Sequence, residues 1–389
     1  MERKKGVKLK NNSEIRQYLE QTTSPGVIKM AVFMELEQLQ TRKLWHQLTL
    51  KLHAYVQDPE VLKKENLRNL YDEFIQPNEN KMNPFTFMKI ISYIITQFTD
   101  PKETIAFLKA QEPKVKNDKE ALIYCKTLQG EIYLDKLKNQ EEAVKLINSI
   151  ETDLADVNDI GIVHNRYYLL ASQLYRIQSK HTEFYRTCLK YLGSMELSTI
   201  SAKEQMQHAF LLSLAALLSD DIYNLGELLQ HPILDSLRHT PNEWLIDLLC
   251  IFNSGDIRKF EEMQPKWASI GDIAVQKDKL RRKISLLCLM EMTFKRQSKD
   301  RKLTFQEIAK ETKLPIDEVE LLVMKALSIG LVKGSIDQVA QEVHLHWVQP
   351  RVIDKSQISS MVKRLDMWLS DVNCMKNIIE EKGLDFLKI

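Results

Sequence analysis

The sequence predicts a mainly α-helical fold, in which a solenoid of helical hairpins leads into a winged helix and then a long terminal helix. Three observations predict it. Proline and glycine, the residues that most often interrupt helices, number only 11 each among 389 residues. A hairpin pattern recurs between the surroundings of Gly130 and those of Ala171. Beyond residue 302, two helical segments are followed by two short alternating segments.

Length and composition indicate a folded protein of more than one domain. A chain of 389 residues is too long for one compact core, while 44% hydrophobic and 28% charged residues are ordinary for a folded protein. The formal net charge of +2 gives no overall field that would attract nucleic acid or a membrane surface. No stretch has the roughly 20 mostly apolar residues of a membrane span. Any partner must therefore be selected by a local surface.

The cysteines and the first residues indicate a cytosolic or nuclear protein. Five cysteines lie far apart in the sequence without a C-x-x-C pair, so neither a zinc site nor a disulfide framework is expected. We interpret them as reduced thiols in the core. The basic residues at the start are not followed by an apolar run, so a secretory signal is not expected either.

Residues 31–180 are expected to form the solenoid arm, after a variable tail over residues 1–30. In ALIYCKTLQGEIYL, apolar residues recur at helical spacing and the small Gly130 leaves room for a neighbouring helix. Ala171 takes the corresponding place in YYLLASQLYRI, and a second helical segment follows each of these two. Such pairs are typical of TPR-like solenoids, in which no unit buries its apolar face alone. An irregular helical domain stays open as the alternative.

Residues 181–302 are expected to continue as helices, forming the first part of a second domain that extends to residue 350. Ser201 and Glu204 have the spacing of a capping box, in which each side chain bonds a backbone amide of the other residue. Later helical patterns end near Pro232 and near Gly255. The segment DKLRRKISLLCLMEMTF then predicts one long helix before the winged element.

Residues 303–350 follow the order of a winged helix: helix, turn, helix, strand, turn, strand. Thr304 and Glu307 form another capping box at the start of the first helix. We expect Gly330 to end the second helix and Gly334 to turn the chain into the wing. The segment EVHLHWV alternates apolar and polar residues, which predicts a strand with one buried face.

The strands of the wing are predicted to dock against another protein. A small sheet has unpaired edge strands, and an edge strand can pair with a strand of a neighbouring chain. The residues expected to make this contact are Gly334, Ser335, Ile336, Val343, Leu345 and Trp347.

Residues 351–389 are expected to form a terminal helix that packs in a bundle. Apolar residues recur alternately three and four positions apart, which is the spacing of a heptad seam. The residues of this seam are Ile358, Met361, Leu365, Trp368, Val372, Met375 and Ile379. Such a stripe must be buried, either against the helix's own domain or against helices of other chains. The narrow seam period favours other chains.

No catalytic, metal-binding or cofactor-binding residues are predicted. The sequence lacks the glycine-rich phosphate loops and the nucleophile or zinc motifs that would indicate an enzyme. His344 and His346 would point to one face of a strand, but neither a third ligand nor a water-activating glutamate accompanies them. We therefore expect two solvent-facing histidines on the wing, no cofactor and no enzymatic activity.

Nucleic-acid binding is the rival hypothesis, and the winged element argues against it. Residues 276–302 contain ten Lys or Arg against three acids, and such a cluster could neutralise phosphates. The second helix of the winged element, however, opens with Asp317, Glu318 and Glu320. In a DNA-reading winged helix these positions would meet bases and phosphates. Carboxylates there indicate a helix stabilised at its positive end and not a DNA reader.

The predicted order of solenoid, helical domain, winged helix and terminal helix resembles the PCI-domain proteins, which are scaffold subunits of the proteasome lid, the COP9 signalosome and a translation initiation factor. Several segments are similar to the proteasome non-ATPase regulatory subunit 13 family. The segments are KLWHQLTL, YNLGELLQHPILDSLR, LRRKISLLCLMEMTF, LTFQEIAK, EVELLVMKALSIGLVKGSIDQV and WVQPRV. The resemblance covers roughly residue 32 to the C-terminus and nothing is carried over for the first 30 residues.

The resemblance implies a non-catalytic scaffold of the 26S proteasome lid, needed for lid assembly and for ATP-dependent degradation of ubiquitinated proteins. It implies a PCI domain over residues 181–350. The implied partners are neighbouring PCI subunits, the pair that contains the deubiquitinase and, as a further candidate, a ubiquitin receptor, in the cytoplasm and nucleus. The alternative is a PCI protein of another complex, such as a COP9 signalosome-like assembly or a nucleic-acid-associated one that uses residues 276–302.

Overall fold

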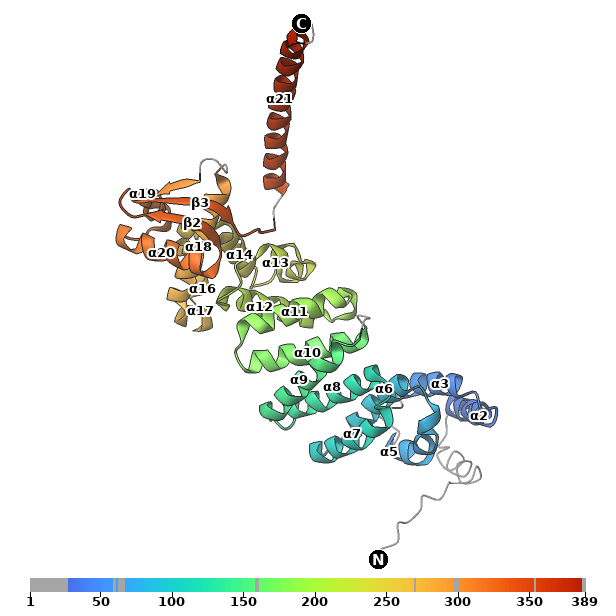
Figure 1. Ribbon diagram of the computed structural model, residues 1–389. Helices are drawn as coiled ribbons and strands as arrows, with labels where there is room; N and C mark the ends of the chain where they lie inside the picture. Colours follow the sequence, from blue (N-terminus) through green and yellow to red (C-terminus); the bar gives the residue numbers. More distant parts are fainter. Residues whose placement is uncertain are drawn as a thin grey trace, which may run out of the picture. The chain divides into compact units, whose positions relative to one another are not determined.

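The computed structural model describes residues 27–58, 61, 67–157, 161–268, 271–296, 301–352 and 355–386. The chain divides into two compact units, Met1–Glu196 and Leu197–Ile389. Both units are mainly helical, and strands occur among the described residues only in the second (Figure 1). The variable tail expected over residues 1–30 lies outside the described residues up to residue 26.

The first unit is a row of helices joined mostly by short turns (Figure 1). Its longer helices are α2 (Val27–Thr41), α3 (Trp45–Gln57), α6 (Pro84–Ile94), α7 (Pro101–Val115), α8 (Lys119–Asp135), α9 (Gln140–Leu154), α10 (Ile162–Ile177) and α11 (His181–Ser194). Between α3 and α6 lie α5 (Leu67–Leu70), a π-helical turn (Tyr71–Ile75) and a 3-10 helix (Gln76–Lys81).

The predicted solenoid is confirmed: α8 pairs with α9, α10 pairs with α11, and the two hairpins are joined where α8 packs on α10. Gly130 lies at that junction, where a Cβ atom would come within 2.6 Å of Cδ2 of Leu170. The chain therefore has its smallest residue at a position where a side chain would collide with the neighbouring helix. The expected domain boundary at residue 180 falls in the turn between α10 and α11, and the first unit continues to Glu196.

The helical part of the second unit ends in one long, largely buried helix. Its elements are a 3-10 turn (Leu197–Thr199), α12 (Ala202–Leu218), α13 (Gly226–Gln230), a 3-10 helix (Pro232–Leu237), α14 (Trp244–Ser254), α15 (Ile257–Glu262), α16 (Gln264–Trp267), α17 (Gly271–Val275) and α18 (Lys277–Lys295). The predicted capping box of Ser201 and Glu204 is present at the start of α12. As expected, α14 ends immediately before Gly255.

The winged helix follows as β1 (Lys302–Thr304), α19 (Phe305–Thr312), α20 (Ile316–Ile329), β2 (Val332–Asp337) and β3 (Glu342–Val348). The capping box of Thr304 and Glu307 is present. Gly330 ends α20 with φ +78°, a left-handed conformation that glycine adopts without strain. The short strand β1, which the sequence pattern did not reveal, completes an antiparallel sheet in the order β1–β3–β2.

The expected turn at Gly334 is wrong. Strand β2 already begins at Val332, and Gly334 lies inside it, beside a β-bulge in the pairing with β3. A Cβ atom on Gly334 would lie 2.1 Å from the backbone oxygen of His344. Glycine is thus required there by the close approach of two strands and not by a turn.

The last element is α21 (Lys355–Phe386), a single helix of 32 residues. Every side chain described on it, from residue 358 to residue 381, is exposed. Among the described residues, no helix is both long and apolar enough to cross a membrane.

Candidate interaction surfaces

The predicted docking residues of the wing fall on two different strands. Gly334, Ser335 and Ile336 belong to β2, which is an edge strand because β3 is its only partner within the described part of the chain. Ser335 is exposed and Ile336 is half-buried. This part of the expected surface has the geometry that strand addition by another chain requires.

Val343 and Leu345 do not lie on an edge, contrary to expectation. They belong to β3, which is the central strand of the sheet, and both are buried in the core of the winged helix. Alternation identified their common face correctly but gave no information about the order of the strands. Because the three-residue β1 covers the outer side of β3, these two residues hold the fold together and are not available to a partner.

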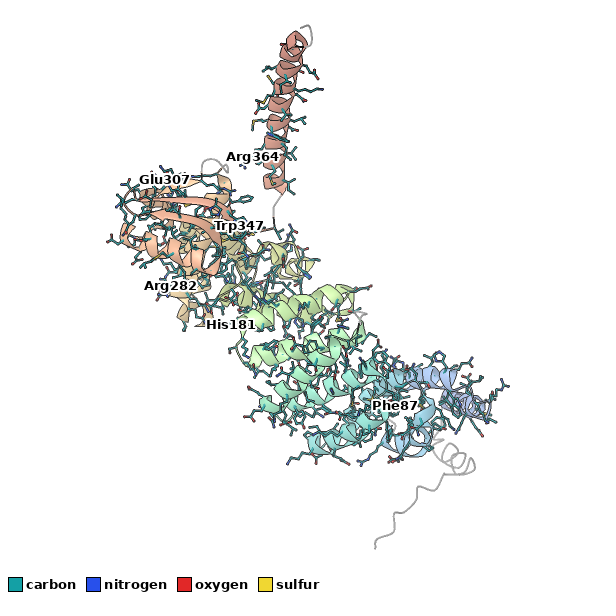
Figure 2. All side chains as sticks on the ribbon, in the orientation of Figure 1. Phe87, His181, Arg282, Glu307, Trp347 and Arg364 are labelled. Carbon is teal, nitrogen blue, oxygen red and sulfur yellow. The ribbon has the colours of Figure 1, made fainter. Side chains whose placement is uncertain are left out.

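Trp347 is half-buried near the end of β3, beyond the bulge (Figure 2). The Nζ atom of Lys333 lies 4.9 Å from the centre of its indole ring, which is the geometry of a cation–π contact. His344 and His346, on the same strand, are both exposed. Within the described parts of the chain, no three His, Cys, Asp or Glu residues are grouped so that they could hold a metal ion.

The predicted seam of α21 is an uncovered apolar stripe. Leu365 and Trp368, at its middle, are 61% and 65% exposed. Packing of this stripe on the helix's own domain was the alternative, and such packing is not observed for the described residues of α21. Side chains project to both sides of the helix in the view of Figure 2, where Arg364 is labelled.

The apolar surface of α21 is wider than a two-helix seam. Three more large apolar residues flank the seam in the heptad pattern. They are Val362, Leu369 and Ile378, and they are 49%, 58% and 48% exposed. One neighbouring helix covers mainly the seam positions. A helix with apolar residues beside the seam as well can bury them only among two or more neighbours.

The residues that lead from the wing into α21 are held on the helical part of the second unit. The Arg351 guanidinium forms an ion pair with Glu291 of α18, and both side chains are about nine-tenths buried, at 10% and 11% exposed. Arg351 also donates to the backbone oxygen of Asn253 at 3.2 Å. Val352 packs directly over Gly226 of α13, where a Cβ atom would lie 2.5 Å from that of the valine. The point at which the chain leaves the domain is thus fixed as far as Val352.

Four basic residues of the stretch at residues 276–302 pair with acids of neighbouring elements. The ion pairs are Lys279 with Asp220, Arg281 with Glu261, Arg296 with Glu307 and Lys302 with Glu342. Residues 297–300 lie outside the described residues. The local charge that the sequence offers to phosphates is therefore much reduced in the folded chain.

Lys283, which the sequence places in this basic stretch, is not a surface residue. It is 4% exposed, and its ammonium donates to the backbone oxygens of Ala216, Leu217 and Ser219 at the C-terminal end of α12. Carbonyls at the end of a helix lack backbone donors within it and carry the negative end of its dipole. The hydroxyl of Ser219 also donates to the oxygen of Ala216, at 3.0 Å. Burial lowers the pKa of Lys283 from 10.5 to about 7. This lysine is a helix cap.

Helical repeats that lead into a winged helix and a long helix after it are the architecture of a PCI-domain protein, and the family model of the PCI domain matches residues 260–347. The family model described as PSD13 N-terminal repeats matches residues 32–249. The chain belongs to the 26S proteasome non-ATPase regulatory subunit 13 family.

Proteins from three organisms are similar in sequence to this chain over most of its length. The 26S proteasome non-ATPase regulatory subunit 13 of Dictyostelium discoideum is 35% identical over 352 residues, covering 89% of this chain and 91% of that protein. Homolog B of Arabidopsis thaliana is 33% identical over 380 residues, with 95% and 98% covered. The 26S proteasome regulatory subunit RPN9 of Saccharomyces cerevisiae is 35% identical over 374 residues, with 90% and 93% covered.

Proposed function

We propose that this chain is a non-catalytic scaffold subunit of the lid of the 26S proteasome regulatory particle. In this role it supports lid assembly and, through the lid, ATP-dependent degradation of ubiquitinated proteins. Its partners are neighbouring PCI subunits and the pair of subunits that contains the deubiquitinase, with a ubiquitin receptor as a further partner to test. The complex acts in the cytoplasm and nucleus. The names of the relatives support membership of the proteasome.

The uncovered stripe of α21 is the observation on which the proposal depends. Seven seam residues and three flanking ones expose a continuous apolar surface on a helix that ends the chain. Water around so much apolar surface is unfavourable, so the helix gains stability when other helices cover it. Helices supplied by neighbouring lid subunits would form such a bundle around α21.

The edge of β2 gives the proposal a second contact. Ser335 and Ile336 lie on this edge, where backbone groups are available to a strand of a neighbouring winged helix. Because Arg351 and Val352 fix the start of the linker to α21, edge and linker belong to one folded body. Two linked contacts bind more tightly than either one alone.

Charge placed in the stripe tests this function. The variants Leu365→Glu and Trp368→Glu would bury an unpaired carboxylate in a helical bundle, which is strongly unfavourable. After co-expression with the other lid subunits, we expect at least a tenfold smaller fraction of either variant in the lid peak on size-exclusion chromatography. Deletion of residues 356–389 should have the same effect.

Ser370→Glu is the matched control, because Ser370 lies on the same helix outside the stripe and is also exposed. It should enter the lid like the unchanged chain. All three glutamate variants should keep the thermal unfolding midpoint of the isolated chain, since the replaced side chains contact little of it. Normal incorporation of Leu365→Glu and Trp368→Glu would rule out the bundle contact.

A further inference from the structure

Helix α20 carries large apolar side chains on the face that points away from its own domain. On the inner face, Val319, Val323 and Ala326 are fully buried and attach the helix to the winged helix. Leu321 and Met324 lie on the opposite side of the helix, and they are 61% and 44% exposed. Burial of the inner residues alone holds α20 in place. The fold therefore does not explain aliphatic residues at positions 321 and 324.

The wing turn extends this surface. The Nε2 atom of Gln338 donates to a carboxylate oxygen of Glu320 at 3.1 Å, which brings the turn between β2 and β3 beside α20. Val339, the next residue of that turn, is 99% exposed. Ile316, at the start of α20, is also exposed. We call these residues the outer α20 patch: Ile316, Leu321, Met324 and Val339.

Acidic side chains surround the outer α20 patch. Asp317 and Glu318 are exposed in the first turn of α20, while Glu320 lies between Ile316 and Met324. Asp337 precedes the wing turn and is exposed. The only basic residue of α20 is Lys325. The acids outnumber it, so the patch repels phosphates of nucleic acids and of anionic lipids and attracts a basic partner.

We propose that the outer α20 patch is a docking surface for a basic amphipathic segment of a partner protein. Aliphatic side chains of that segment would cover Leu321 and Met324, and its Lys or Arg side chains would face the surrounding carboxylates. In a DNA-reading winged helix the corresponding helix face enters the major groove. Here the same exposed face binds protein. The patch adjoins the end of β2 but shares no residue with the contact proposed at Ser335 and Ile336 or with the stripe of α21, and the proposal does not depend on the function proposed above.

A designed peptide tests the patch directly. The probe is a fluorescein-labelled helical peptide of about 15 residues, or four turns, with leucines along one face and arginines beside them. Its counterpart carries glutamate in place of every arginine. The full-length chain is used with Leu365→Gln and Trp368→Gln, so that the stripe of α21 does not compete for the peptide. We expect saturable binding of the arginine peptide in fluorescence anisotropy and no binding of the glutamate peptide.

Substitutions within the patch assign the binding to α20. Leu321→Gln together with Met324→Gln keeps helix propensity and side-chain length, so the chain should fold normally. We expect at least a tenfold weaker affinity for the arginine peptide. Asp317→Asn with Glu318→Gln should weaken binding severalfold and make it less sensitive to salt, because salt screens exposed charges.

Exposed apolar residues of the first unit provide the matched control. Ile162 and Ile177 are 51% and 46% exposed, and Ile162→Gln with Ile177→Gln should leave the affinity unchanged. Absence of binding by the arginine peptide would overturn the proposal. So would equal binding of the two peptides, or an affinity that survives the substitution of Leu321 and Met324.

Discussion

Arg351 connects three parts of the second unit through one side chain. Its guanidinium bonds Glu291 of α18 and the backbone of Asn253 in the last turn of α14, while Arg351 itself follows β3. Such a pair gives little net stability when both partners are present, but removal of one partner leaves a buried charge alone. The pair therefore mainly specifies where the segment before α21 must lie.

Arg351→Met should lower the free energy of unfolding by up to about 3–5 kcal/mol, because the buried Glu291 would keep only the exposed Lys295 as a partner, at 3.7 Å. Chemical denaturation of the full-length chain measures the change. The control is Arg238→Met, which removes the ion pair between Arg238 and Asp235. The side chains of these two residues are 63% and 64% exposed. Exposed pairs contribute only about 0–1 kcal/mol. Similar losses in the two variants would show that burial does not decide the effect.

Lys283 makes the second unit sensitive to pH in a defined direction. Burial, with Lys279 nearby, lowers the pKa of Lys283 from 10.5 to about 7. At pH values between about 7 and 10.5, the Lys283 amine is protonated in the unfolded chain and neutral in the folded chain. Stability contributed by this group therefore increases as pH rises from about 7 toward 10.5.

Comparison of the chain with its Lys283→Met variant isolates this effect. We expect the unfolding midpoint of the unchanged chain to rise between pH 7 and pH 9 relative to the variant. The variant should also be less stable at every pH, because three carbonyl oxygens lose their donor, at about 1–3 kcal/mol for an unsatisfied buried group. Lys277→Met, which replaces an exposed lysine of the same helix, should follow the unchanged chain. If the unfolding midpoints of Lys283→Met and Lys277→Met changed with pH in the same way, this role of Lys283 would be contradicted.

At the scale of elements, the order of the strands decides which residues a neighbour can reach. The alternation in EVHLHWV predicted a strand with a buried face, and β3 has one. Alternation is a property within one strand, whereas edge or centre is a property of the whole sheet. The short β1 placed β3 in the centre, and three residues are too few to produce a recognisable pattern.

Gly334→Ala should weaken the pairing of β2 with β3. The added Cβ would lie 2.1 Å from the backbone oxygen of His344, so the strands must separate or the bulge must change. Overpacking of this kind costs about 1–3 kcal/mol. We expect faster amide hydrogen exchange across both strands and a lower unfolding midpoint. The control is Ser335→Ala at the neighbouring exposed position, which should change neither the hydrogen exchange nor the unfolding midpoint. Unchanged exchange in Gly334→Ala would show that the sheet accommodates the added methyl group.

For the whole molecule, charge distribution argues against nucleic acid as a partner. A formal net charge of +2 gives no general attraction, and acids of neighbouring elements pair with four residues of the basic stretch. Arg282 remains exposed on α18 (Figure 2). Lys277 and Lys295 are exposed on the same helix, and three exposed side chains provide few phosphate contacts for salt-dependent binding.

The full-length chain should therefore not bind duplex DNA or single-stranded RNA at micromolar concentration in a gel-shift assay at physiological salt. The charge-reversal variant Arg281→Glu with Arg282→Glu should behave in the same way. Lys283 is left unchanged in this experiment because it is buried and its replacement would perturb the fold. Binding that weakens with salt and disappears in the variant would restore the nucleic-acid alternative.

Local patterns in the sequence determined the helices, both capping boxes, the helix stop at Gly330, the hairpin repeat around Gly130 and the apolar stripe of α21. Each of these depends on residues a few positions apart, which the chain brings together by backbone geometry alone. Tertiary structure alone decided that Lys283 caps a helix far away in sequence, that Arg351 pairs with Glu291 and that Val343 and Leu345 lie in the centre of the sheet. These features depend on which distant segments meet, because burial and pairing are set by neighbours that the local pattern does not contain.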